Sequence, residues 1–230
     1  MRRIDDLQLK DLKIIQETNH FCFGTDAVAL ANFVVSHSHI KKETKIIDFC
    51  TGNGIVPLLL AGKTQCENIM GIEIQKEVAS LAQENVEFNN LQNRIKIINE
   101  DIVGAAIGRP SSKEYPSIIT CNPPYKPAIS GLKSSNQFLN IARNEITITL
   151  EQIIIKASEL LQDKGKLFMI HKPERLAEII KISGQHKLEA RRIQMVHNDI
   201  KKPPCLVLIE LVKNGGSNLI IEPPEIINNA

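Results

Sequence analysis

Residues 45–57 of the chain read KIIDFCTGNGIVP, and this stretch decides the fold. Its first five residues predict a short buried strand with Ile46, Ile47 and Phe49 as its apolar residues, and the Gly-x-Gly segment after them predicts a tight turn. The apolar residues beyond the turn predict a helix with Pro57 in its first turn, where a missing N–H is tolerated. A strand, a glycine turn and a helix make the first half of a nucleotide-binding βαβ unit.

The rest of the chain continues this alternation of strands and helices. It predicts an α/β fold in which a seven-stranded, mostly parallel sheet is covered by helices on both faces. The last two strands have little sequence between them, so we expect an antiparallel final strand. Strands are predicted at residues 45–49, 68–73, 95–99, 115–121, 166–170, 192–196 and 206–211, and the later helices at residues 76–89, 150–161 and 175–183.

Length and composition fit one large domain with additions at both ends. With 230 residues and 43% hydrophobic content, the chain can bury a sizeable core. We expect residues 1–44 to form an N-terminal extension with a strand-like piece and a helix. Residues 45–213 should form the main domain, and residues 214–230 a polar tail.

Charge and cysteine content restrict the class of protein. The net charge of +2 does not by itself indicate a binding partner. Residues 162–216, however, form a basic segment, with 11 Lys and Arg residues against 6 Asp and Glu residues. The five cysteines form no C-x-x-C pair, and the chain shows no signal-peptide pattern or apolar run long enough to span a bilayer. These observations favour a cytoplasmic protein with no membrane segment. No metal-ligand spacing is present, and the sequence leaves the oligomeric state open.

The glycine turn does not fit a dinucleotide cofactor. A dinucleotide-binding turn needs Gly or Ala at the third spaced position, which is Pro57 in this chain. Asp48 stands at the end of the strand before the turn, where it would lie unfavourably close to a pyrophosphate. A ligand with a sulfonium and an ammonium group would instead be attracted by this carboxylate.

Acidic residues also follow the next two strands. Glu73 lies where an acidic side chain can accept hydrogen bonds from both hydroxyls of a ribose. Asp101 follows the third strand and could accept from an adenine amino group. Three acids at successive strand ends favour S-adenosylmethionine over a nicotinamide cofactor, although such acids can also act as helix caps, and for Asp101 that alternative stays open.

A second chemical signal is the sequence Asn122-Pro123-Pro124-Tyr125, directly after a strand. The two prolines restrict the backbone to an extended shape. The side-chain oxygen of Asn122 and the carbonyl of Pro123 can then point at one place, with the Tyr125 ring as a wall. Two acceptors beside a flat surface suit a planar ring with an exocyclic amino group, which describes a nucleobase.

Two basic segments are candidates for phosphate contacts. Residues 126–147 show no regular period and carry Lys126, Lys133 and Arg143, so we expect a substrate-contacting loop, with passive disorder as the alternative. Lys201 and Lys202 belong to the basic C-terminal third and could also meet phosphates, although a solvated basic face would have the same composition.

These motifs resemble the class I S-adenosylmethionine-dependent methyltransferases, which have a Rossmann-like fold. More closely, the chain resembles the bacterial tRNA(Val) adenine-N6 methyltransferase family. The narrower resemblance is carried by residues 3–7, 21–28, 142–145, 171–176 and 207–210. Asn144 departs from the expected His, and Asn198 from the expected Pro.

The resemblance implies N6-methylation of an adenine in a tRNA anticodon loop, adenine 37 of a tRNA1(Val)-type substrate. It implies that Asn122 and Pro123 hold the amino group while Tyr125 stacks on a base extruded from the RNA. The cofactor-binding residues that it implies are Thr25, Asp26, Asp48, Gly52, Gly54, Glu73, Asp101 and Asn122.

Other functions remain open on the sequence. The same Asn-Pro-Pro-Tyr turn could bind a guanine N2 amino group in rRNA or a protein glutamine amide. A non-catalytic RNA-binding module that retained the fold is a further alternative. Without the resemblance, the sequence favours Thr25 or Asp26 as the N-cap of a surface helix. His171 and His197 accompany no nucleophile motif and are interpreted as structural or RNA-facing.

Overall fold

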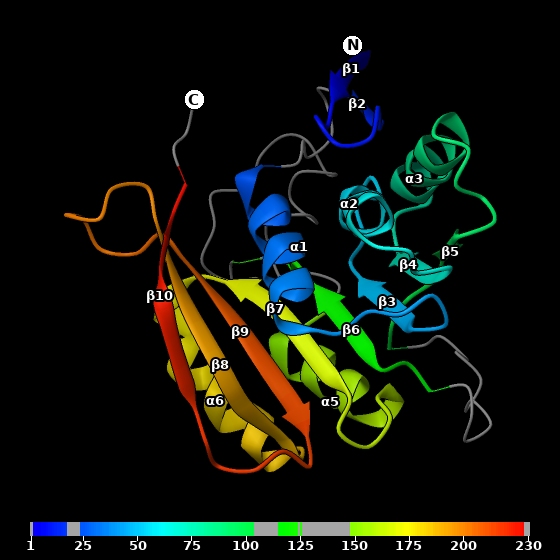
Figure 1. Ribbon diagram of the computed structural model, residues 1–230. Helices are drawn as coiled ribbons and strands as arrows, with labels where there is room; N and C mark the ends of the chain where they lie inside the picture. Colours follow the sequence, from blue (N-terminus) through cyan, green and yellow to red (C-terminus); the bar gives the residue numbers. More distant parts are fainter. Residues whose placement is uncertain (1, 18–23, 104–114, 124, 126–147, 228–230) are drawn as a thin grey trace.

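The computed structural model describes residues 2–17, 24–103, 115–123, 125 and 148–227. An eight-stranded sheet forms its centre (Figure 1). The strands are β3 (Lys45–Phe49), β4 (Asn68–Glu73), β5 (Ile95–Asn99), β6 (Ile118–Cys121), β7 (Lys166–His171), β8 (Leu188–His197), β9 (Leu206–Lys213) and β10 (Ile220–Ile226).

The strand order is β10-β8-β9-β7-β6-β3-β4-β5. The stretch that opens the fold, β3, therefore lies between β4 and β6. Strand β9 runs antiparallel to both β7 and β8, whereas all other neighbours are parallel. The expected α/β architecture with an antiparallel strand among parallel ones is confirmed.

Strand β10 is the additional strand, and it lies within the segment for which a polar tail was predicted. It pairs in parallel with β8, and the register shifts between Glu222 and Glu225. Pro223 and Pro224 stand at this shift and lack the N–H groups of a regular ladder, so the sequence pattern did not predict a strand. A similar effect shortens β6, which begins at Ile118 rather than at residue 115, because Pro116 cannot donate to a neighbour.

Helices cover both faces of the sheet. The first three lie together on one face and the last two on the other (Figure 1). None of the helices in the described part of the chain is long and apolar enough to cross a membrane. They are α1 (Thr25–His37), α2 (Ile55–Lys63), α3 (Lys76–Phe88), α5 (Leu150–Leu160) and α6 (Leu176–Gln185), with a short 3-10 turn, η1 (Pro173–Arg175), before α6.

Alternate residues of β3 pack against the two helix layers. Ile46 packs with the α1 and α2 side, whereas Ile47 and Phe49 pack with the α5 side. This is the period-two alternation of a strand that is buried on both faces. Asp48 is a buried acid near the carboxyl end of the strand, where the sheet edge meets the turn to α2.

The N-terminal segment forms an antiparallel hairpin, β1 (Arg2–Asp6) and β2 (Lys13–Glu17). The fully buried amide of Asn85 in α3 anchors it, accepting from Ile15 N at 2.6 Å and donating to Ile15 O at 3.0 Å. The same amide donates to Asn53 O at 3.0 Å. One side chain thus connects the hairpin, α3 and the glycine turn.

We expect Asn85→Ala to lower the free energy of unfolding by roughly 3 kcal/mol, because it leaves buried backbone groups of Ile15 and Asn53 without partners. Urea denaturation would measure this. Asn89→Ala is the matched control, since Asn89 makes the same pair of hydrogen bonds with Lys13 in a more exposed place. It should cost less than about 1 kcal/mol. Equal losses would contradict the anchoring role of Asn85.

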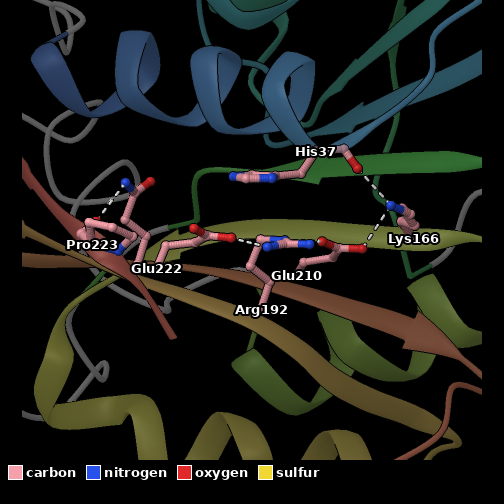
Figure 2. A network of polar contacts seen from close by, with 7 residues as sticks. His37, Lys166, Arg192, Glu210, Glu222 and Pro223 are labelled. Carbon is pink, nitrogen blue, oxygen red and sulfur yellow. Dashed lines mark hydrogen bonds and ion pairs between the residues drawn. The ribbon is translucent and has the colours of Figure 1, made fainter. Parts of the chain in front are cut away.

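An ionic network ties the C-terminal strands to α1 (Figure 2). Glu210 of β9 is 4% exposed and accepts from Lys166 Nζ at 2.8 Å and Arg192 Nε at 3.2 Å. Arg192 also pairs with Glu222 of β10, and Lys166 donates to the carbonyl of His37, the last residue of α1, at 2.7 Å. A buried carboxylate is tolerated only with such partners, and the network joins β7, β8, β9 and β10.

Candidate active site

The turn between β3 and α2 has an irregular backbone. Cys50, Gly52 and Gly54 have positive φ angles of 55°, 58° and 84°. A Cβ on Gly54 would lie 3.3 Å from the Cβ of Ala82 in α3, so this glycine allows the turn to pack closely on that helix. A Cβ on Gly52 would have no atom within 4 Å. The backbone at Gly52 therefore borders open space.

Glu73 stands beside this open space at the end of β4. Its side chain is buried, with 5% of the residue exposed. One carboxylate oxygen accepts from Gly52 N at 3.0 Å and the other from Gln75 N at 2.9 Å. Burial raises the pKa of this carboxyl group, and the backbone donors oppose that effect. Each oxygen keeps a lone pair with which it could accept a ligand hydroxyl.

Asp48 is held differently, by two hydroxyl groups. Thr51 Oγ1 donates to one carboxylate oxygen at 2.6 Å, and Thr120 Oγ1 of β6 donates to the other at 2.5 Å. Burial raises the pKa of Asp48 to about 7, and the hydroxyl hydrogen bonds act against this rise. The carboxylate joins β3, the glycine turn and β6. The bracing role of Thr120 could have been suspected from a hydroxyl in an otherwise aliphatic strand.

The third predicted acid lies in a more open place. Asp101 is exposed, and its Oδ1 accepts from Val103 N at 2.9 Å. This contact fits the alternative in which the residue caps its own turn. A contact between Asp101 and a cofactor stays a prediction.

Asn122, Pro123 and Tyr125 follow β6, the strand next to β3. Because parallel neighbours end at the same edge of a sheet, they lie near the glycine turn and Glu73. Asn122 Nδ2 donates to Asp26 Oδ2 at 3.1 Å, and the Tyr125 hydroxyl lies 2.8 Å from the same oxygen and 2.5 Å from Asn122 Oδ1. Burial, followed by the charge of Asp26, raises the pKa of Tyr125 well above its usual value.

Asp26 and Thr25 come from the first turn of α1, but neither caps the helix. The N-cap is Gly24, without a side-chain cap hydrogen bond. The capping alternative for these two residues is therefore wrong. Asp26 is buried with its carboxylate on Asn122 and Tyr125, whereas Thr25 is exposed.

The Tyr125 ring is half-buried and contacts two neighbouring residues. It meets the buried His171 ring edge-on, with centroids 5.5 Å apart, and Lys172 Nζ lies 5.6 Å from its centroid. His171 Nδ1 accepts from Lys172 N at 2.8 Å, which leaves the ring proton on Nε2 in the neutral form. Burial and then the charge of Arg175 lower the pKa of His171 to about 4. His171 is neutral near pH 7 and supports the tyrosine.

The predicted phosphate-binding residues are less well placed by the structure. Lys126, Lys133 and Arg143 lie outside the described residues. Lys201 and Lys202 are exposed in the turn between β8 and β9. Since β8 runs parallel to β7, β6 and β3 in the sheet, this turn lies at the same edge as Asn122.

A protein family and several known proteins match most of this chain. The family model described as the methyltransferase small domain matches residues 11–190. A tRNA1(Val) (adenine(37)-N6)-methyltransferase of Proteus mirabilis is 34% identical over 189 residues, which are 81% of this chain and 71% of that protein. The protein of the same name in Porphyromonas gingivalis is 29% identical over 187 residues, 81% of this chain and 72% of that one.

Solved structures show the same fold. A predicted O-methyltransferase from Agrobacterium tumefaciens superposes with a TM-score of 0.66 at 23% identity, covering 87% of this chain and 86% of that chain. A putative RNA methyltransferase from Pyrococcus horikoshii superposes with a TM-score of 0.60 at 18% identity, covering 84% and 86%. The chain belongs to the methyltransferase small domain family and, as its motifs predicted, to the tRNA1(Val) (adenine(37)-N6)-methyltransferases.

Proposed function

We propose that this protein transfers a methyl group from S-adenosylmethionine to N6 of adenine 37 in the anticodon loop of a tRNA1(Val)-type substrate. The observation that carries the proposal is the pair of acceptors after β6, Asn122 Oδ1 and the Pro123 carbonyl, at the sheet edge that holds the glycine turn. Within the described residues, no hydrogen bond is donated to the Pro123 carbonyl. The Pro123 carbonyl can therefore accept from a substrate amino group, and Asn122 Oδ1 can do so once the Tyr125 hydroxyl releases it.

The residues around the glycine turn fit S-adenosylmethionine. The open space at Gly52 and the buried carboxylate of Glu73 suit a ribose with two free hydroxyls. When bound, the cofactor supplies a methyl group on a positively charged sulfur. The family resemblance places Thr25, Asp26, Asp48, Gly52, Gly54, Glu73, Asp101 and Asn122 in the cofactor site. Of these, Asp26 and Asn122 contact each other and Tyr125, so we assign them to the side of the site that faces the target amino group.

The acceptor pair addresses the main chemical difficulty of the reaction. The amino nitrogen of adenine is a poor nucleophile because its lone pair is delocalised into the ring. Hydrogen bonds from its two protons to Asn122 Oδ1 and the Pro123 carbonyl favour a geometry in which the lone pair is directed at the methyl group. Positioning of this kind can lower a barrier by several kcal/mol, and no separate base is required before transfer.

Tyr125 has a second part in the proposal. Its ring replaces the stacking that the adenine loses when it leaves the RNA. The Tyr125 hydroxyl contacts Asn122 Oδ1 in the absence of substrate, so it has to release that oxygen when the amino group arrives.

A tRNA partner also explains the charge distribution. The basic segment of residues 162–216 includes Lys201 and Lys202, which lie at the active-site edge of the sheet. Phosphate contacts from these lysines, and from Lys126, Lys133 and Arg143, would hold the anticodon arm. A protein with this substrate would work in the cytoplasm.

We expect tRNA binding to weaken as salt rises, and Lys201→Ala with Lys202→Ala to reduce the slope of log K against log salt by about 1 to 2. Each lysine that meets a phosphate releases a counterion on binding. Titration of labelled tRNA at several salt concentrations would measure the slope. The matched control is Lys41→Ala with Lys42→Ala, an exposed pair before β3 at the opposite edge. Equal slopes for the two double variants would exclude the contact.

The product itself tests the proposed function. The protein should be incubated with labelled S-adenosylmethionine and total tRNA, and the RNA then digested to nucleosides. We expect label in N6-methyladenosine. Label in N2-methylguanosine, or in protein alone, would instead support the guanine or glutamine alternatives and overturn the proposal.

A further inference from the structure

Asp26 forms a hydrogen-bonded group with two residues that are far from it in the sequence. Asn122 and Tyr125 lie 96 and 99 residues away along the chain, yet both side chains meet one oxygen, Asp26 Oδ2, at 3.1 and 2.8 Å. The other oxygen accepts from Ala27 N at 2.9 Å. Asp26 is 8% exposed, and Ala27 and Leu30 beside it are buried in the core. The carboxylate is therefore held firmly.

The carboxylate determines which way the Asn122 amide faces. An asparagine side chain has an acceptor on one arm and a donor on the other, whereas an ionised carboxylate only accepts. The arm that faces Asp26 Oδ2 must therefore be the NH₂ group. A flipped amide would bring its carbonyl oxygen against the carboxylate, and two acceptors repel each other. With Nδ2 held by Asp26, Oδ1 is the atom presented on the other side.

Asp26 also influences where the Tyr125 hydroxyl donates its proton. This hydroxyl has one proton and two acceptors within reach, Asp26 Oδ2 and Asn122 Oδ1. If the proton goes to Asn122, the acceptor that the target amino group needs is occupied. If it goes to Asp26, Asn122 Oδ1 is free. A charged carboxylate is the stronger acceptor, so it can draw the hydroxyl away when an amino group competes for the amide oxygen.

We propose that Asp26 is a positioning residue for methyl transfer, which orients the Asn122 amide and takes up the Tyr125 hydroxyl so that Asn122 Oδ1 can receive the target amino group. This inference rests on the proposed function. It assigns Asp26 to the substrate side of the site, whereas the family resemblance placed it among the cofactor-binding residues.

Single-turnover kinetics of Asp26→Ala test the proposal. With cofactor and tRNA both saturating, we expect the rate to fall about 10- to 100-fold, because a misplaced acceptor loses the productive geometry. The dissociation constant for S-adenosylmethionine should stay within about threefold of wild type, a range that corresponds to less than 1 kcal/mol. A tenfold weaker cofactor complex, or an unchanged single-turnover rate, would overturn the assignment.

A double-mutant cycle examines the hydroxyl. Tyr125→Phe keeps the ring and removes the competing proton donor. In that background Asp26→Ala should cost at least about fivefold less in rate than it does with the tyrosine present. Equal losses of rate in the two backgrounds would show that Asp26 does not act through the Tyr125 hydroxyl. Asp26→Asn keeps the size of the side chain and one acceptor oxygen, so it should give an intermediate rate, and it replaces the alanine variant if that protein does not fold.

Nuclear magnetic resonance of the Asn122 side-chain amide provides a readout that needs neither cofactor nor RNA. The signal is assigned by its absence in Asn122→Ala. In wild type the Nδ2 protons should exchange slowly, and in Asp26→Ala or Asp26→Asn faster, with thermal melting as the check on folding. Unchanged exchange would overturn the orienting role. If wild type proves to methylate another amino group, the proposed function fails, whereas this result on Asp26 still stands.

Discussion

Asn122→Ala should lower the rate of methyl transfer by about 10²- to 10³-fold, the loss seen when one preorganised hydrogen-bonding group is removed from an active site. The variant lacks one of the two acceptors for the target amino group, and the Pro123 carbonyl alone cannot orient it. Affinity for S-adenosylmethionine should change by no more than about threefold, less than 1 kcal/mol. Single-turnover assays and calorimetry would provide the two measurements.

Asn122→Asp is a useful companion to this variant. It keeps the size of the side chain but brings a second carboxylate next to Asp26, whose Oδ2 now accepts from Asn122 Nδ2. We expect it to be as inactive as the alanine variant, because two like charges at this distance would force the groups apart. If alanine lowered cofactor affinity and rate by the same factor, Asn122 would belong to the cofactor site rather than to the substrate site.

Glu73→Ala should reverse this pattern, with cofactor affinity lost first. A charged carboxylate that accepts from two ribose hydroxyls contributes about 1.5–3 kcal/mol for each hydrogen bond, so we expect a dissociation constant raised at least about 10²-fold. The change also removes the acceptor for Gly52 N, which holds the turn against β4. Calorimetric titration with S-adenosylmethionine would measure the loss.

Glu73→Gln separates the two functions of that side chain. It can still accept from Gly52 N through its remaining oxygen, but it replaces the other carboxylate oxygen with a donor. The glutamine variant loses the acceptor for Gln75 N, so it should melt between the alanine variant and wild type. It should bind the cofactor almost as weakly as alanine does. A Glu73→Ala protein that bound the cofactor tightly would show that the ribose lies elsewhere.

The sheet could largely be predicted from the sequence because its signals are local. The apolar runs around Ile47 and Ile119 and the helical period after Lys76 need no knowledge of distant residues. The same logic brought Glu73 and Asn122 together, since residues that follow neighbouring parallel strands share one edge of the sheet. Strand β10 was missed because Pro223 and Pro224 conceal a strand whose pairing depends on β8.

Contacts across long sequence separations could not be predicted. Which side chains of α1 point at Asn122 depends on how that helix packs on the sheet. Asp26 and Asn122 are 96 residues apart in the sequence, so no local pattern predicts that they are in contact. The pairing of Asp48 with Thr120 likewise requires knowledge that β3 and β6 are neighbours. Sequence reasoning placed Asp26 in the site through family resemblance, but it could not identify the atoms that Asp26 meets.

The position of β9 has a consequence for how the protein is made on the ribosome. Strands β7 and β8 are synthesised first, yet neither can pair with the other, because β9 lies between them in the finished sheet. A nascent chain that has not yet reached Leu206 lacks both β9 and β10, so it leaves one open edge on β7 and two on β8, which are templates for pairing between chains. At about 5–20 residues per second this stage is brief, but slower synthesis of the C-terminal strands would prolong it and favour aggregation.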